Sequence, residues 1–152
     1  MKSDKLRLFL ALEIPEKLKA KITALTLPVR SFPVQWVTSK NLHITLKFLG
    51  ETPLGKKAQI IETLSSIKFK PFSVHIKKGG CFYDSSGHPK VLFLSIENPQ
   101  INEMAGLIET ALLALGFEKE SRSFSPHLTH ARIKGKLSAL KTERFLKLSE
   151  KF

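Results

Sequence analysis

The stretch Asn41-Leu42-His43-Ile44-Thr45-Leu46-Lys47-Phe48-Leu49-Gly50 has the composition of a buried strand, apart from a histidine and a threonine that stand two residues apart. The same His-x-Thr spacing returns in Pro126-His127-Leu128-Thr129-His130-Ala131-Arg132-Ile133-Lys134, again among apolar residues. Short apolar runs of this kind are typical of strands in a covered sheet. The chain therefore carries two strands with one polar motif in common.

Alternation of side chains along a strand divides each motif between two faces. His43 and Thr45 share one face, and Ile44, Leu46 and Phe48 are expected to fill the other. The second motif divides in the same way, so each strand offers an imidazole and a hydroxyl about 7 Å apart. One face of each strand is expected to form core and the other a site.

Paired imidazole and hydroxyl groups suit phosphodiester chemistry. Because the ordinary pKa of histidine is near 6.5, one of two imidazoles can act as a base while the other acts as an acid. His43 and His127 are the predicted catalytic pair, and chemistry alone does not say which is the acid. Thr45 and Thr129 are predicted to donate hydrogen bonds to the phosphate oxygens. This mechanism requires no metal or other cofactor.

Arg132 follows the second motif and is a candidate phosphate ligand. Strict alternation puts it on the face opposite Thr129, so only a bulge or a twist would turn it toward the phosphate.

The same alternation of side chains along a strand disfavours a metal site. His127 and His130 point to opposite faces of a strand, and no carboxylate is close in sequence.

The order of apolar runs, glycines and prolines indicates an α+β protein. Gly79-Gly80 is expected to interrupt a strand, Asn98 to begin a helix and Gly116 to follow its end. Strands are expected at 6–14, 34–37, 42–49, 72–78, 81–83 and 91–96 and in the second motif, and helices after Pro15, around 60–67, between 98 and 115, and after Gly135 with Leu137, Leu140 and Phe145 on its apolar face.

The element order of the second half resembles that of the first half with one strand added. We therefore predict two pseudo-symmetric lobes, each a mainly antiparallel sheet with helices on its outer face, and an active-site cleft between them. Each lobe would contribute one His-x-Thr strand, and residues 1–152 would form a single bilobal domain.

Charge and cysteine content point to a nucleic-acid partner and a reducing compartment. The 25 Lys and Arg against 13 Asp and Glu leave a net charge of +12, which favours a polyanion such as RNA. Cys81 is the only cysteine, and the first residues are too charged for a secretion signal or a membrane span. A cytoplasmic monomer without a membrane partner is expected.

The sequence also offers candidates for base stacking or for lining the cleft, which are Trp36, Phe48, Tyr83 and Arg122.

These residues together resemble the 2H phosphoesterase superfamily, and within it the bacterial and archaeal RNA 2′,3′-cyclic phosphodiesterases, also called 2′-5′ RNA ligases. The resemblance covers most of the chain in order. It begins at Arg7-Leu8-Phe9-Leu10-Ala11-Leu12, includes Trp36-Val37, Val91-Leu92-Phe93-Leu94 and both motifs, and extends to Arg122-Ser123-Phe124-Ser125 before the second motif.

The resemblance implies a bilobal α+β fold and metal-independent hydrolysis of a 2′,3′-cyclic phosphate end of RNA to a 2′-phosphate. It also implies weak, reversible 2′-5′ joining of RNA. By position, His43 would be the proton donor and His127 the proton acceptor.

Two departures from the family pattern stand out. His130 occupies a position that is more often apolar, and the C-terminal strands of the family are expected to be missing after Phe152, which would leave a sheet edge unpaired.

Two alternatives remain open at this point. The chain could be a basic RNA-binding module without catalysis, which would bind RNA in a salt-dependent manner whether or not the histidines are present. It could also be a sister phosphodiesterase that acts on 2′-5′ oligonucleotides or on small cyclic nucleotides.

Overall fold

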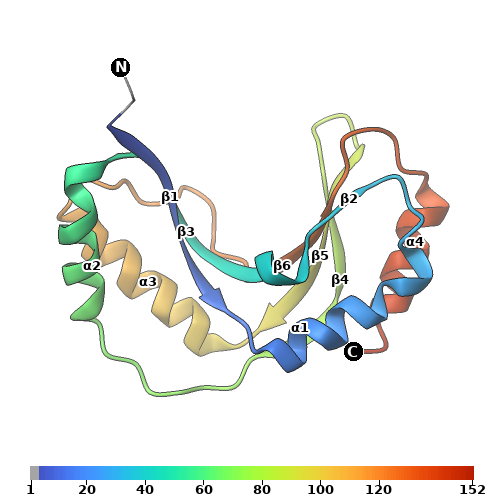
Figure 1. The fold of residues 1–152 in the computed structure, drawn as a ribbon, viewed down its shortest axis with the longest axis horizontal. Coiled ribbons are helices and arrows are strands. Elements are labelled where there is room, and N and C mark those ends of the chain that lie inside the picture. Colours follow the sequence, from blue (N-terminus) through green and yellow to red (C-terminus); the bar gives the residue numbers. More distant parts are fainter. Residues whose placement is uncertain (1–3) are drawn as a thin grey trace. The chain divides into compact units, whose positions relative to one another are not determined.

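A computed structural model describes residues 4–152 and shows a mixed α+β fold with antiparallel strands, as predicted (Figure 1). The strands are β1 (Lys5–Glu13), β2 (Gln35–Trp36), β3 (His43–Pro53), β4 (His75–Tyr83), β5 (Pro89–Glu97) and β6 (His127–Arg132). The α-helices are α1 (Glu16–Leu25), α2 (Lys57–Ser65), α3 (Pro99–Leu113) and α4 (Ala139–Ser149), and short 3-10 turns are η1 (Leu27–Val29), η2 (Ser39–Asn41) and η3 (Leu54–Lys56).

The chain divides into two compact units that are not the two halves of the sequence. Among the described residues, unit 1 contains 4–11, 45–74 and 98–126, and unit 2 contains 12–44, 75–97 and 127–152. The prediction that each half forms one lobe with its own motif is therefore wrong in its boundaries. Helix α3 follows a strand of unit 2 but packs on α2 in unit 1, because contacts between apolar faces outweigh proximity along the chain.

Unit 1 contains most of β1, most of β3, and helices α2 and α3, which lie side by side (Figure 1). Helix α3 buries Ile101, Ala105, Ile108 and Leu112, which recur at helical spacing. Its start is capped as the sequence predicts, since the Asn98 side chain accepts a hydrogen bond from the Gln100 amide at 2.7 Å. Gly116 follows the helix with a φ of +83°, a left-handed conformation that glycine adopts without a steric penalty.

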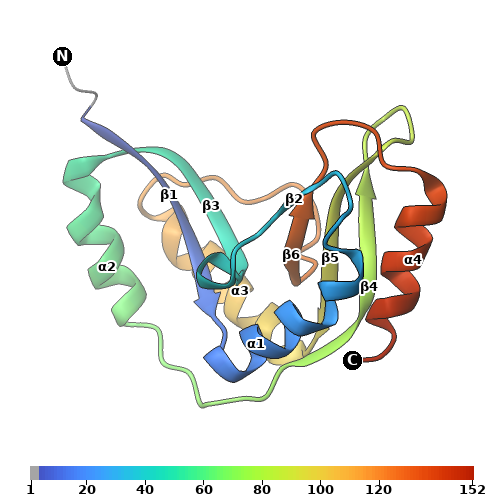
Figure 2. The same ribbon diagram turned by 45° about the vertical axis from the view of Figure 1, so that its right-hand side comes forward.

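Unit 2 is built on the antiparallel strands β4, β5 and β6, which run side by side with α4 against β4 (Figure 2). The short strand β2 pairs with the end of β6. On the α4 side, the buried residues Leu92, Leu94, Leu128 and Phe145 form the core. This arrangement leaves the other face of β4, β5 and β6 half-exposed.

Several local predictions differ from the structure. Gly79 and Gly80 do not interrupt a strand but lie inside β4, where each is closely approached by a side chain from another element. Strand β4 begins only at His75, later than the sequence pattern predicts. Helical spacing predicts Leu140 on the apolar face of α4, but this residue is 75% exposed because Thr142, Phe145 and Ser149 form the buried side.

No helix within residues 4–152 is long and apolar enough to span a bilayer.

Candidate active site

Pairing of β3 with β6 in unit 2 brings the two motif histidines onto one face of the sheet. Ile44 pairs with Leu128 in antiparallel register, and both are buried. The next pair in this register sets His43 opposite Thr129, with His127 two residues further along β6 on the same face. Diagonal neighbours on adjacent strands lie about 7–8 Å apart, so one phosphate group could contact both imidazoles.

A bulge in β6 turns Arg132 onto the same face as Thr129. Phe93 of β5 pairs with Thr129 but Leu92 pairs with Ala131, so β6 carries one extra residue, His130. The result is visible in the burial pattern, since His130 and Ala131 are both buried and Arg132 is exposed. Strict alternation, which puts Arg132 on the face opposite Thr129, is therefore wrong here. The bulge that would turn Arg132 toward the phosphate is present.

Strand β3 shows the same break in the alternation of burial after its motif. Leu46 and Lys47 are consecutive buried residues, and Phe48 is 59% exposed. The prediction that Phe48 packs in the core is wrong, whereas its candidacy as an exposed aromatic is consistent with this placement. Lys47 turns inward because its ammonium group donates hydrogen bonds to Glu109 Oε1 at 2.7 Å and to the Glu118 carbonyl at 2.8 Å.

The two motif strands thus share a longer pattern than the sequence revealed. In each strand the histidine and the threonine are half-buried, and two consecutive buried residues come directly after the threonine. An exposed side chain stands five residues after the histidine. That side chain is Phe48 in the first strand and Arg132 in the second. The same burial pattern therefore exposes an aromatic group on one strand and a cation on the other.

Aromatic residues that the sequence did not single out lie next to the motif residues. In unit 1, Phe9 lies 6.1 Å from Phe48 between ring centroids, and both rings are exposed. In unit 2, Phe82 and Phe93 lie 5.0 and 5.4 Å from the ring of His127. The only sequence signal for the second group is a glycine, Gly80, which pairs with Phe93 and leaves room for its ring.

The remaining predicted residues lie outside this group. Trp36 pairs with Ala131 and shares its face, its indole N–H donates to the Arg30 carbonyl at 3.1 Å, and its ring packs against His130. Trp36 therefore belongs to the core side of the sheet and not to the histidine face. Tyr83 is exposed at the end of β4, where the partial loss of water around its hydroxyl, followed by the neighbouring Cys81 thiol, raises its pKa. Arg122 is exposed in the segment of unit 1 that precedes β6.

His130 is a buried histidine that faces away from the proposed catalytic pair. It is 1% exposed between the rings of Trp36 and Phe145, and neither of its ring nitrogens has a hydrogen-bond partner among residues 4–152. Burial, aided by the positive charge of Arg30, lowers its pKa from 6.5 to about 4. The neutral imidazole therefore acts as an apolar core group at neutral pH, which accounts for a histidine at this position.

His130 should make the fold sensitive to acid. Above pH 6.5 the side chain is neutral in both the folded and the unfolded states, and its titration has no effect on stability. Between pH 6.5 and 4 the unfolded chain takes up a proton that the folded chain does not, so the free energy of unfolding should fall by about 3 kcal/mol at pH 4. Urea unfolding from pH 4 to 7 should show this loss in the wild-type protein and less of it in His130→Leu; parallel pH curves would contradict the assignment.

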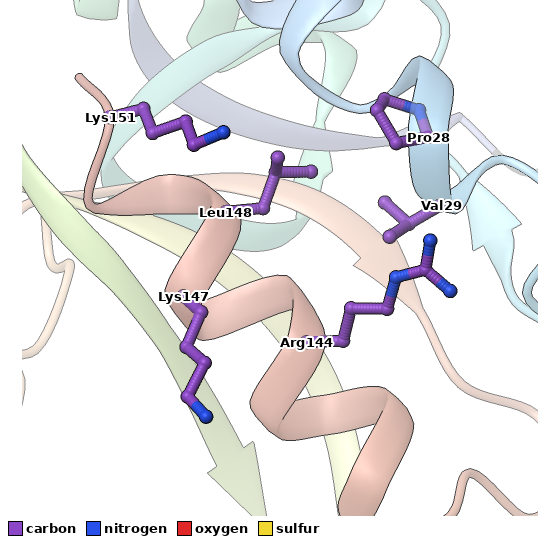
Figure 3. Close-up of a pocket in the computed structure, with 6 residues that line it drawn as sticks. All are labelled: Pro28, Val29, Arg144, Lys147, Leu148 and Lys151. Atoms are coloured by element: carbon purple, nitrogen blue, oxygen red, sulfur yellow. The ribbon is translucent and has the colours of Figure 1, made fainter.

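A pocket of about 320 Å³ lies between α4 and η1 (Figure 3). Its lining residues are Pro28, Val29, Arg144, Lys147, Leu148 and Lys151. Figure 3 shows Arg144 directed toward Val29 and Lys147 directed away from the others, and Lys147 forms an ion pair with Glu143 at 2.8 Å. None of the predicted site residues lines this pocket, so we place the candidate site on the histidine face.

Comparison with known proteins identifies the family of this chain. Residues 12–93 match the family described as LigT-like phosphoesterase. The chain is 36% identical over 129 residues to the RNA 2′,3′-cyclic phosphodiesterase of Methanocaldococcus jannaschii, covering 85% of this chain and 72% of that protein. A protein of the same name from Archaeoglobus fulgidus is 33% identical over 133 residues, covering 86% and 74%.

Among solved structures, a protein of Thermus thermophilus superposes with a TM-score of 0.78 at 27% identity, covering 88% of this chain and 77% of that one. The chain therefore belongs to the LigT-like phosphoesterase family of the 2H superfamily, as its motifs predicted. It is an enzyme of the phosphodiesterase class.

Proposed function

We propose that this protein is an RNA 2′,3′-cyclic phosphodiesterase that opens the cyclic phosphate at an RNA end to a 2′-phosphate. The observation that carries the proposal is the register of Ile44 with Leu128, through which His43, His127 and Thr129 share one face of unit 2. The names of the relatives in Methanocaldococcus jannaschii and Archaeoglobus fulgidus support the substrate class.

In the proposed reaction His127 accepts a proton from water as the water oxygen attacks phosphorus. The bond from phosphorus to the 3′ oxygen breaks, and His43 donates a proton to that departing oxygen, which leaves the phosphate on the 2′ position. Every proton and bond is then accounted for by the two imidazoles and one water. The assignment of His43 as acid and His127 as base follows the family resemblance, since the two motifs are alike.

Negative charge on the phosphate oxygens grows during the attack, and hydrogen-bond donors aimed at them lower the barrier. Thr129 is proposed as one donor and Thr45 as another. Arg132 is proposed to add a charge-assisted contact, because the bulge at His130 turns it onto the face of Thr129. Since two imidazoles, two hydroxyls and a guanidinium supply acid, base and charge stabilisation, the reaction is proposed to need no metal.

The exposed pair of Phe9 and Phe48 in unit 1 is proposed as a stacking surface for a nucleobase. Two exposed aromatic rings 6.1 Å apart are costly to leave in water, and every base offers a flat face to stack on them. Stacking of this kind tolerates different bases, so weak base preference is expected.

Slow reversal of the ring-opening chemistry, which would join RNA through a 2′-5′ bond, is proposed as a side activity.

Incubation of the protein with an oligoribonucleotide that ends in a 2′,3′-cyclic phosphate, in excess EDTA, tests this function. We expect full conversion to the 2′-phosphate with a rate unchanged by the chelator. Arg132→Ala should lower kcat and also weaken substrate binding, because it removes a cation from a phosphate whose negative charge grows during the attack.

Three results would contradict the proposal. Loss of activity in EDTA that zinc or magnesium restores would reject the metal-free mechanism. A 3′-phosphate product would reject the proposed direction of ring opening. Salt-dependent RNA binding with no turnover would instead indicate an RNA-binding module, and turnover confined to 2′-5′ oligonucleotides or small cyclic nucleotides would indicate a sister activity.

A further inference from the structure

Two stacked phenylalanine rings lie against the imidazole of His127 in unit 2. Phe82 of β4 and Phe93 of β5 stack with ring centroids 4.2 Å apart and planes 24° apart. The imidazole meets the two rings edge-on, at 5.0 Å and 84° from Phe82 and at 5.4 Å and 64° from Phe93. These values fall within the range in which edge-to-face aromatic pairs are attractive, so the two rings form a wall beside the imidazole.

The wall exists only because Gly80 has no side chain. Gly80 pairs with Phe93 across β4 and β5, and a Cβ atom at Gly80 would overlap Cζ of Phe93. The ring of Phe93 therefore lies directly over the backbone of Gly80, in the space that any other residue would fill. Gly79, the preceding residue, faces α4 instead, where a Cβ would overlap Oγ of Ser149.

We propose that Phe82 and Phe93 are positioning residues for His127, and that Gly80 is required because it admits the Phe93 ring. The role as a positioning device for catalysis rests on the proposed function, whereas the contact itself does not.

The physical reason is the rotational freedom of the imidazole. The ring of a half-buried histidine can rotate about two side-chain bonds, but proton transfer to or from water requires a fixed direction. Two aromatic rings that contact one side of the imidazole, both steeply inclined to its plane, restrict these rotations. Because Phe82 is 40% exposed, the wall also borders the surface where a substrate would arrive.

Loss of the wall should lower kcat more than it changes KM. A displacement of about 1 Å at a catalytic group can cost about 100-fold in rate, so we expect kcat to fall roughly 10- to 100-fold in Phe93→Leu and in Gly80→Ala. Phe82→Leu should have the same effect in weaker form, and Phe82→Tyr, which keeps the ring, should behave like the wild-type protein.

Nuclear magnetic resonance of the histidine ring protons tests the contact without reference to activity. The His127 signals, assigned as those that disappear in His127→Gln, should be displaced by the ring currents of the two phenylalanines relative to the signals of the exposed His75 and His88. This displacement should shrink in Phe82→Leu and Phe93→Leu and should change in Gly80→Ala.

Two matched variants control for general loss of stability. Gly79→Ala strains the same strand on the opposite face, and Phe72→Leu removes an aromatic ring that contacts Phe69 in unit 1. Neither should move the His127 signals or change kcat. Phe82→Leu alters a partly exposed side chain, so it keeps the test available if Gly80→Ala does not fold.

His127 signals that remain unchanged in both phenylalanine variants would overturn the proposal. So would a fall in kcat that is no larger than in Gly79→Ala at equal stability. If the signals shift as expected but the wild-type protein does not open cyclic phosphates, the contact stands and the proposed function fails.

Discussion

Replacement of His127 or of His43 by alanine is expected to lower kcat for a cyclic-ended oligonucleotide by about 10²- to 10⁴-fold, the usual contribution of a general acid or base. The two residues lie on one face of unit 2 through the pairing of Ile44 with Leu128, which is why both should act on one phosphate. Because they act as a unit, the double variant should be little worse than either single variant. Steady-state kinetics with the 2′-phosphate product quantified would measure these effects.

His88→Ala is the matched control for these variants. His88 lies in the loop between β4 and β5, where it faces Asp84 at 3.4 Å, and it takes no part in the proposed chemistry. Its removal should leave kcat unchanged. Near-normal turnover in either His43→Ala or His127→Ala would exclude the two-histidine mechanism, and binding of RNA by both variants would show that they remain folded.

Replacement of Glu109 by alanine is expected to destabilise unit 1 by about 3–5 kcal/mol, because it leaves the buried ammonium group of Lys47 without its counterion. The Lys47 side chain is 2% exposed, and its Nζ lies 2.7 Å from Glu109 Oε1. The other oxygen, Oε2, accepts a hydrogen bond from the Glu120 amide, so the carboxylate also holds the segment after α3. Urea unfolding would measure the loss.

A surface ion pair provides the comparison. Lys147 and Glu143 are 2.8 Å apart on α4, and both side chains are more than half exposed, so Glu143→Ala should change stability by less than about 1 kcal/mol. The double variant Lys47→Met with Glu109→Leu should recover most of the loss of Glu109→Ala, because it removes both buried charges. Equal stabilities of Glu109→Ala and Glu143→Ala would contradict the role assigned to the buried pair.

The amino-acid sequence by itself determined the features that depend on residues close together in the chain. The repeated His-x-Thr spacing predicted two equivalent strands, and its alternation correctly put Ile44 and Leu128 in the core. Asn98 before Pro99 and Gly116 after the last turn marked the beginning and end of α3, because capping and left-handed turns depend on a few adjacent residues.

Only the tertiary structure decided which side chains share the histidine face. The bulge at His130 is set by the register between two strands, and the inward turn of Lys47 is set by its contact with Glu109, so the placement of Arg132 and Phe48 could not be read from alternation. Gly79 and Gly80 resemble a strand break in sequence, but side chains from other elements fill the space above them. The sequence offers Trp36 as a candidate for base stacking, but its pairing with Ala131 puts it on the core side of the sheet. Each of these outcomes depends on contacts between residues far apart in sequence, which local propensities do not encode.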